Sequence, residues 1–589
     1  ARALVDSDYS FGAWLRQRRK ALGLTHAALA ERAYCSVSAL RKIEQDERRP
    51  SQRLAERLAG CLQIGSAERA RFVALARGEG PVQELARGFA VPLPSLPPAR
   101  ASELEGPAPL RSALPPLEEM PSIAVLPFIN LSDDAANEYF ADGLAAELLN
   151  VLARIPGLRV ASRTSAFWFK GKDVDLPTAA HKLNVSTILE GSVRKSGQRV
   201  RIAAQLVRVA TDSPLWSQTY DRDLQDVLSV QDDIAQSVVQ ELRQALLGEQ
   251  VDAVASARVQ AQMALATRGR TGNPQAHKLY LQGRFLIDRL TRDDTSTGIG
   301  YCRRALEMDP NYALAWCGLA CAYSSQAGFY WVPPAEAFEL ARSAAQHALR
   351  IEPDLPEAHS ELGWVRMTCD WDWAGAEQSY RRALATGSGN RSIVIAASLL
   401  ADNVGRKDDA VALARRAVAL DPLSFTAQGN LALRALNADL LDEAMTAVQT
   451  AIGLNPRGVL LHWLHGTILL AQGRPEEAFE AFGREEVPQL RAQGFVLAHH
   501  AAGRQKESDA ALAQLIETGA EDSAFQIAEA LGWRGDVDDA FEWLERAYEQ
   551  RDPGVGQLRS GPFFRKLEAD PRWAAFLRKI GFTGLPDGG

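Results

Sequence analysis

The stretches VALDPLSFTA (residues 418–427) and IGLNPRGVLL (452–461) decide the fold of the C-terminal half of this chain. Both place an acidic or amide residue before a proline at the end of an Ala-rich segment, and Pro422 and Pro456 lie 34 residues apart. The same feature recurs earlier in the chain, in LEMDPNYALAW (306–316) and LRIEPDLPEAH (349–359). Because proline cannot continue a helix, each of these prolines marks a helix end. The sequence therefore predicts helices that repeat at a fixed interval.

Small residues recur at the same interval. Ala444, Ala451 and Pro456 repeat the spacing of Ala410, Ala417 and Pro422. A period of about 34 residues with this pattern resembles the tetratricopeptide repeat (TPR) family. The resemblance implies an α-solenoid over residues 273–589 in which roughly eight helix pairs stack as a superhelix. The stretch GPFFRKLEADPRWAAFLRKIGF (561–582) is expected to supply a closing helix.

Partner-binding residues follow from the same resemblance. In TPR arrays the first helix of each pair lines a concave face that holds a peptide or another protein. The resemblance thus implies partner contacts for side chains of these helices, namely Trp316, Tyr323, Trp364, His462, Trp463 and His465. Packing between neighbouring repeats is the alternative role for each of them. The acidic balance of this half favours basic or neutral partners.

The first 80 residues carry a charge opposite to that of the rest. They contain 15 Lys+Arg and 9 Asp+Glu, a balance of +6, whereas the whole 589-residue chain has a formal net charge of −7. The remainder therefore carries −7 minus +6, which is −13. A basic small domain on an acidic body is typical of a nucleic-acid reader joined to something else, with a solvated charged surface as the alternative.

Residues 11–76 read as five short helices. Gly23 ends the first helix, and Thr25 and Ser36 are suitable N-caps for the two helices that follow. Two short helices joined so closely indicate a helix-turn-helix. These residues resemble the XRE-type, or lambda-repressor-like, family. The matching stretches are LRQRRKALGLT (15–25), ALAERA (28–33) and SVSALRKIEQDERRPS (36–51).

In that family the second helix of the motif lies in the major groove of DNA. The resemblance places four residues at base edges, Val37, Ser38, Arg41 and Lys42, and four at phosphates, Thr25, Ser36, Arg48 and Arg49. Lys and Arg can donate to guanine, Ser to several bases, and Val can contact a thymine methyl group. Capping hydroxyls suit phosphate oxygens. Double-stranded DNA is the expected partner, and a helical bundle used for protein contact is the alternative.

Two departures from the family pattern bear on DNA affinity. His26 stands where the family often has Gln, and Asp46-Glu47 replace the usual Asn-Gly turn after the reading helix. Two carboxylates that faced the phosphates would repel them. We therefore expect modest sequence-specific affinity.

Residues 79–120 form a predicted spacer, because ten prolines between 81 and 121 exclude a regular helix and favour an extended chain. An α/β domain is predicted to follow at 121–248. IAVLPF (123–128) and LRVASR (158–163) read as strands on either side of the helix EYFADGLAAELLNVLARI (138–155). STILEGSVRK (186–195) and RVRIAAQLVRV (199–209) complete a small mixed sheet.

This region resembles the TolB-N-terminal-like family, which often stands beside helix-turn-helix or cyclase domains and ahead of TPR arrays. The matching stretches include IAVLPFINLSDD (123–134), ARIPGLRVASRTSAFWFKGK (153–172) and ILEGSVRKSGQRVRIAAQLV (188–207). The resemblance implies a fold and no reaction. The expected organisation is a DNA-binding domain (1–78), the spacer (79–120), the α/β domain (121–248), a connecting segment (249–272) and the TPR superhelix (273–589).

Catalysis, cofactors and metals are not expected. The six cysteines are scattered, and the sequence has no Gly-x-Ser-x-Gly, His-Glu-x-x-His, phosphate-loop or dinucleotide motif. No apolar run approaches the roughly 18 residues that cross a bilayer, and ARALVDSDYSFG (1–12) lacks a secretion-signal pattern. No membrane is expected as a partner, and the predicted location is the cytoplasm.

The sequence thus predicts a multidomain, mainly α protein with a five-helix DNA-binding domain, a small α/β domain and a TPR solenoid. The predicted function is a cytoplasmic DNA-binding transcription regulator whose α/β and TPR parts sense or recruit a protein, peptide or small ligand. A homodimer would read two half-sites about one DNA turn apart. The alternative is a signalling adaptor that uses the TPR groove and binds DNA only non-specifically.

Overall fold

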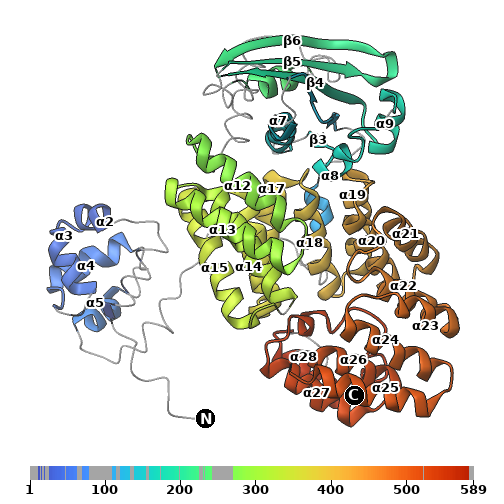
Figure 1. Cartoon of the computed structure of the whole chain (residues 1–589). Coiled ribbons are helices and arrows are strands. Elements are labelled where there is room, and N and C mark those ends of the chain that lie inside the picture. Colours follow the sequence, from blue (N-terminus) through green and yellow to red (C-terminus); the bar gives the residue numbers. More distant parts are fainter. Residues whose placement is uncertain are drawn as a thin grey trace. The chain divides into compact units, whose positions relative to one another are not determined.

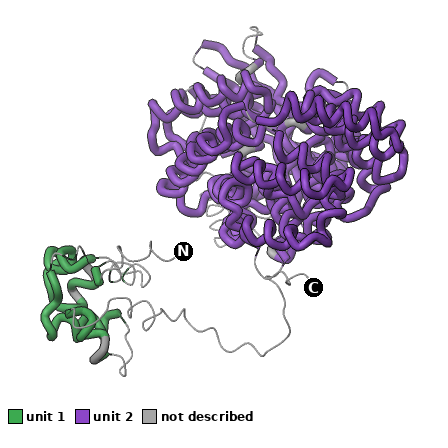
Figure 2. The backbone as a smooth tube through the Cα atoms, turned by 90° about the horizontal axis from the view of Figure 1, so that it is seen from below, with its two compact units in different colours: residues 1–107 green, residues 108–589 purple. Residues whose placement is uncertain are grey.

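The computed structural model describes residues 11, 12, 15, 19, 26–77, 109–241 and 269–582, with gaps at 45, 47, 63–68, 115–119, 133–137, 154, 156–157, 173, 198, 224–229, 231–232, 330 and 522. The chain divides into two compact units, residues 1–107 and residues 108–589 (Figure 2). We describe each unit by itself. No helix in the described part of the chain is both long and apolar enough to cross a membrane.

Unit 1 is a helical bundle around one small apolar core. Its helices are α2 (His26–Arg32), α3 (Val37–Glu44), α4 (Gln52–Cys61) and α5 (Arg69–Arg77). The predicted first helix is described only at Phe11, Gly12, Leu15 and Arg19, which are helical, so the predicted count of five is not confirmed. Leucines from several helices are fully buried in this core together with Phe72.

Unit 2 begins with an α/β domain. Its elements in chain order are β1 (Ser122–Val125), β2 (Ile129–Asn130), α7 (Glu138–Leu152), β3 (Arg159–Val160), α8 (Arg163–Phe167), α9 (Leu176–Leu183), β4 (Thr187–Ser196), β5 (Arg199–Arg208) and β6 (Ser213–Asp223). The strand order is β3-β1-β4-β5-β6, with β2 beside β4. β1 is parallel to β3 and β4, and β4, β5 and β6 are antiparallel, which confirms the predicted mixed sheet (Figure 1).

The rest of unit 2 is built from eight consecutive helix pairs within the described residues. The pairs are α12 (Pro274–Ile287) with α13 (Arg292–Met308), α14 (Ala313–Gly328) with α15 (Pro334–Ile351), α16 (Pro356–Val365) with α17 (Trp373–Gly387), α18 (Arg391–Asn403) with α19 (Lys407–Leu420), α20 (Phe425–Asn437) with α21 (Leu441–Leu454), α22 (Leu461–Ala471) with α23 (Pro475–Gly483), α24 (Pro488–Ala501) with α25 (Gln505–Gly519), and α26 (Ala524–Arg534) with α27 (Val537–Glu549). We call them repeats 1–8.

The first helix of each repeat contacts the first helix of the next, from α12 through to α26. These helices therefore form one continuous surface, which we call the first-helix surface. Fully buried alanines such as Ala410, Ala417, Ala444 and Ala451 pack where the helices of a pair meet, as the repeated small residues predict. The 34-residue interval of the sequence thus corresponds to one helix pair of a TPR-like array.

The last part of the predicted spacer is packed against the repeats. Leu110–Ala113 form a short 3-10 helix, η2. The backbone N–H groups of Leu110 and Arg111 donate to the Asp409 carboxylate over 2.9 and 3.1 Å, and Leu110 is fully buried. An extended spacer therefore does not continue unbroken to residue 120.

Candidate nucleic-acid interface and partner surfaces

Helix α3 presents a polar face to solvent because its apolar face is held in the core of unit 1. Leu40 and Ile43 are buried, whereas Ser38, Arg41 and Lys42 are exposed. Residues three and four positions apart lie on one side of a helix, so these three side chains project together. Val37 is half-buried and packs against the core, at the edge of this face.

The four predicted phosphate contacts differ in what the structure shows of them. Thr25 lies outside the described residues. Ser36 caps α3, because its hydroxyl oxygen accepts the Ala39 N–H over 3.1 Å. Arg48 is exposed, and Arg49 donates to the Arg77 carbonyl oxygen at the end of α5 over 2.8 Å.

The histidine that departs from the family pattern belongs to a buried polar cluster. The Glu44 carboxylate accepts from Arg19 Nε over 2.6 Å and lies 3.0 Å from His26 Nε2. Burial alone would raise the pKa of Glu44, but the hydrogen bonds with Arg19 and His26 outweigh it and hold the pKa below its ordinary value. His26 thus helps to fix α3 to the preceding helices.

One residue of the acidic turn after α3, Asp46, contacts the first helix. Asp46 has a positive φ of 59° and accepts the Gly12 N–H over 2.8 Å. A Cβ atom at Gly12 would lie 2.6 Å from the Ile43 carbonyl oxygen, so only glycine fits there. The expected repulsion of phosphate is therefore reduced at Asp46, whose carboxylate is engaged by this helix. Glu47 lies outside the described residues.

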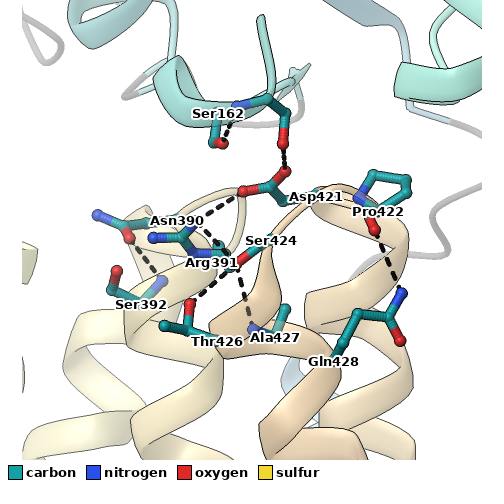
Figure 3. A network of polar contacts seen from close by, with 11 residues as sticks. Ser162, Asn390, Arg391, Ser392, Asp421, Pro422, Ser424, Thr426, Ala427 and Gln428 are labelled. Carbon is teal, nitrogen blue, oxygen red and sulfur yellow. Dashed lines mark hydrogen bonds and ion pairs between the residues drawn. The ribbon is translucent and has the colours of Figure 1, made fainter. Parts of the chain in front are cut away.

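The α/β domain of unit 2 is fastened to repeats 4 and 5 by a buried carboxylate (Figure 3). Asp421, in the turn after α19, accepts from the Ser165 hydroxyl of α8 and from Arg391 Nη1 of α18 over 2.6 Å. Arg159 of β3 donates to the Ala419 carbonyl oxygen over 3.0 Å. The acidic residue that the repeat pattern places before proline is here recruited to join two domains.

The C-terminal segment, which we define as residues 551–582, folds back over the first-helix surface. Ser560 donates to Asn403 of α18 over 3.1 Å. The Phe563 ring lies 5.8 Å from that of Trp463 on α22, and a Cβ atom at Gly532 of α26 would meet the Phe563 carbonyl oxygen at 2.9 Å. The segment includes η7 (Pro553–Gln557) and the predicted closing helix, α28 (Pro571–Lys579).

This segment is a structural part of the array. Its apolar side chains are almost fully buried in the core of repeats 3–8, including Leu558, Phe563, Phe564, Phe576 and Ile580. Burying each such side chain contributes roughly 1.5–3 kcal/mol. A peptide partner that competed for the same surface would have to displace all of them.

The predicted partner residues fall into two groups around this segment. Trp463 is buried, and its indole N–H donates to Gln493 over 2.9 Å. His462 Nε2 lies 2.9 Å from the Pro456 carbonyl oxygen. Burial lowers the pKa of His465, and the nearby His462 lowers it further. Trp463 therefore packs between repeats, beneath the C-terminal segment.

The other three predicted residues lie in repeats 1–3. Trp316 stacks on His347 at 4.5 Å, and the Tyr323 hydroxyl accepts from Arg303 over 2.9 Å. Trp364 is half-buried, and its indole N–H is a buried donor with no acceptor among the described residues. Among the described residues, Trp364 is thus the one of the three whose side-chain nitrogen has no hydrogen-bond partner.

Sequence reasoning missed a charged cluster beside Trp364. Arg284 of α12 pairs with Asp288 over 2.9 Å, and the Ser324 hydroxyl of α14 donates to Glu361 of α16 over 3.3 Å. Arg284 and Asp288 form a local pair four residues apart, whereas Ser324 and Glu361 stand on two other helices without a motif. The 34-residue interval, which aligns successive first helices, was the signal that could have brought them together.

The comparisons with known proteins support a helix-turn-helix in the N-terminal unit. A family model described as a helix-turn-helix domain matches residues 10–72. A curated protein of Rhizobium meliloti (strain 1021), "Putative adenylate cyclase 3", is 33% identical over 258 residues. That match covers 43% of this chain and 42% of the relative, so the chain spans less than half the length of this relative.

Solved structures with similar folds are distant. A tetratricopeptide repeat protein from Parabacteroides merdae is 13% identical, with a TM-score of 0.32, over 44% of this chain and 99% of that one. TolB from Acinetobacter baumannii is 16% identical, with a TM-score of 0.17, over 21% of this chain and 28% of that one. The helix-turn-helix match and the chain's own succession of helix pairs show that it combines a helix-turn-helix domain with a TPR-like helical array.

Proposed function

We propose that this protein is a transcription regulator that binds a specific DNA site through α3 and binds a protein partner through its TPR-like repeats. The observation that carries the proposal is the exposed face of Ser38, Arg41 and Lys42 on a helix whose other face is fixed in a core. These side chains can donate to base edges in the major groove. The match to a helix-turn-helix model over residues 10–72 supports the same role.

DNA binding by a Lys42→Glu variant tests this proposal. Mapping of the DNA bound in cells would first supply a natural site, and fluorescence anisotropy would then measure its affinity for the full chain. We expect Lys42→Glu to weaken binding at least about tenfold, because it removes a donor and adds a negative charge near phosphates.

The matched control is Arg53→Glu, which makes the same change of charge at an exposed position of α4. A general electrostatic effect would weaken binding equally in both variants. Equal losses would therefore contradict base recognition by α3.

We further propose that two copies act together on DNA. A single helix-turn-helix buries a small surface on DNA. A two-fold dimer that reads half-sites roughly 34 Å apart binds more tightly, because two domains contact the DNA at once. Mass photometry on the bound duplex checks this expectation. One copy per natural site would exclude the dimer.

The second candidate function is a recruiting adaptor. It is favoured by the polar groups that the first-helix surface of repeats 1–3 displays, among them Arg284 and Glu361. A salt titration separates the two functions, because a specific reader keeps a preference for its site over random duplex as salt rises. An adaptor would show only a weak attraction that salt abolishes.

A further inference from the structure

The C-terminal segment limits where a partner can bind the repeats. Its contacts reach first helices of repeats 4, 5, 6 and 8, at Asn403, Asn437, Trp463 and Gly532. In repeat 3 its contacts fall after α16, where a Cβ atom at Gly556 would lie 3.5 Å from the Met367 carbonyl oxygen. Among the described residues, the first helices α12, α14 and α16 are therefore the part of the first-helix surface that remains for a partner.

Charged groups from α12 and α16 meet on this part of the surface. The Arg284 side chain, although surrounded by neighbouring helices, is 31% exposed, and that of its partner Asp288 is 63% exposed. Glu361 is half-buried, and the hydrogen bond that it accepts from the Ser324 hydroxyl is long at 3.3 Å. Solvent thus reaches the Asp288 side chain and part of residue Glu361.

The cluster holds one cation for two carboxylates. Asp288 uses the charge of Arg284, whereas Glu361 forms no ion pair with any residue that the structure describes. Glu361 is faced by Arg284 of α12, Cys321 of α14 and Tyr380 of α17, and Asp288 at the end of α12 lies near Cys321. A partly buried carboxylate without a counter-ion is costly, and a cation supplied from outside would offset that cost.

An aromatic ring stands next to this carboxylate. Trp364 follows Glu361 by three residues on α16, so the two lie on one side of the helix. Tryptophan is the best aromatic partner for a lysine or arginine.

We infer that the surface formed by α12, α14 and α16 binds a cationic segment of a partner protein, with a lysine, arginine or amino terminus paired to Glu361 and lying against Trp364. The inference rests on the proposed partner role of the repeats and does not depend on DNA binding. It excludes the surface of repeats 4–8, where the C-terminal segment lies.

Panning of a phage library of random dodecapeptides with free amino termini against the full chain tests this inference. We expect the enriched peptides to carry Lys or Arg, and anisotropy with labelled peptides to give their affinities. Glu361→Gln should weaken binding about tenfold, because it removes one partly buried ion pair. A tenfold change in affinity corresponds to about 1.4 kcal/mol. Trp364→Phe should weaken it less.

The pH dependence provides a second readout. Burial, opposed by Arg284, Ser324 and Cys321, raises the pKa of Glu361 to about 7. A bound cation favours the ionised form, so affinity should rise as pH increases through about 7. Glu361→Gln should remove this rise, which a purely structural role of Glu361 would leave in place.

The control is Glu443→Gln, which changes a carboxylate that pairs with Arg415 on the second helices, over 2.7 Å. It should leave peptide affinity unchanged. Enrichment of acidic peptides, enrichment of none, or equal losses in the Glu361 and Glu443 variants would overturn the inference. DNA affinity measured on the same samples separates this failure from failure of the regulator proposal.

Discussion

At the scale of single residues, the polar side chains that matter most are those that hold the functional helix in place. Glu44 is buried with Arg19 and His26, and the hydrogen bonds keep its pKa low. Glu44→Gln would leave Arg19 buried without a counter-ion, at a cost of about 3 kcal/mol to unit 1. Hydrogen exchange of the α3 amides measures this loss, and protection equal to wild type would contradict it.

The same carboxylate makes stability depend on pH. Because the folded pKa of Glu44 is below its unfolded value of about 4.3, its contribution is present above that pH and is lost as the pH falls through the folded value. Acid titration of unit 1 stability should therefore be flatter in Glu44→Gln than in wild type. Identical titrations would show that Glu44 is not coupled to folding.

At the scale of elements, much of the structure follows from local pattern. The stretch LPTAAHKL forms α9 (Leu176–Leu183), because Asp175 caps it and proline lies in its first turn. β6 was missed, because its mostly exposed residues show no alternation of apolar and polar side chains.

Ser36→Ala should destabilise α3 by about 1 kcal/mol through loss of its cap. Urea denaturation of unit 1 checks this value, and no change would exclude a role of the cap.

The candidate sites were predictable only where they lie on one element. Ser38, Arg41 and Lys42 share a helix, so spacing alone places them together. Asp46 meets Gly12 from 34 residues away, and Ser560 meets Asn403 from 157 residues away. No local periodicity encodes such pairs, which arise only when the whole unit packs.

At the scale of the whole molecule, residues near the C-terminus complete the core of repeats 3–8. A chain ending at residue 550 would expose the apolar surface that Phe563, Phe564 and Ile580 cover. We expect it to aggregate and to bind a hydrophobic dye, because large apolar patches are rarely left exposed. Size-exclusion chromatography with dye fluorescence tests this expectation, and a monodisperse truncated chain without dye binding would contradict it.

Coupling between the α/β domain and the repeats belongs to the same scale. Asp421 joins Ser165 and Arg391, and its loss removes the carboxylate that accepts from the buried Ser165 hydroxyl and balances the charge of Arg391. Asp421→Ala should lower the stability of unit 2 by about 3 kcal/mol and separate the melting of the two domains. Asp439→Ala, which removes an exposed partner of Arg565, is the control. A single unchanged transition in Asp421→Ala would show that the domains are not joined there.

The central claim is that α3 reads DNA bases, and selection from a random duplex pool by the full chain tests it most directly. The account predicts that wild type enriches a defined sequence motif and that Arg53→Glu enriches the same motif. Lys42→Glu should lose that motif. Enrichment of no motif by the folded wild-type chain would contradict the claim and leave the recruiting adaptor in its place.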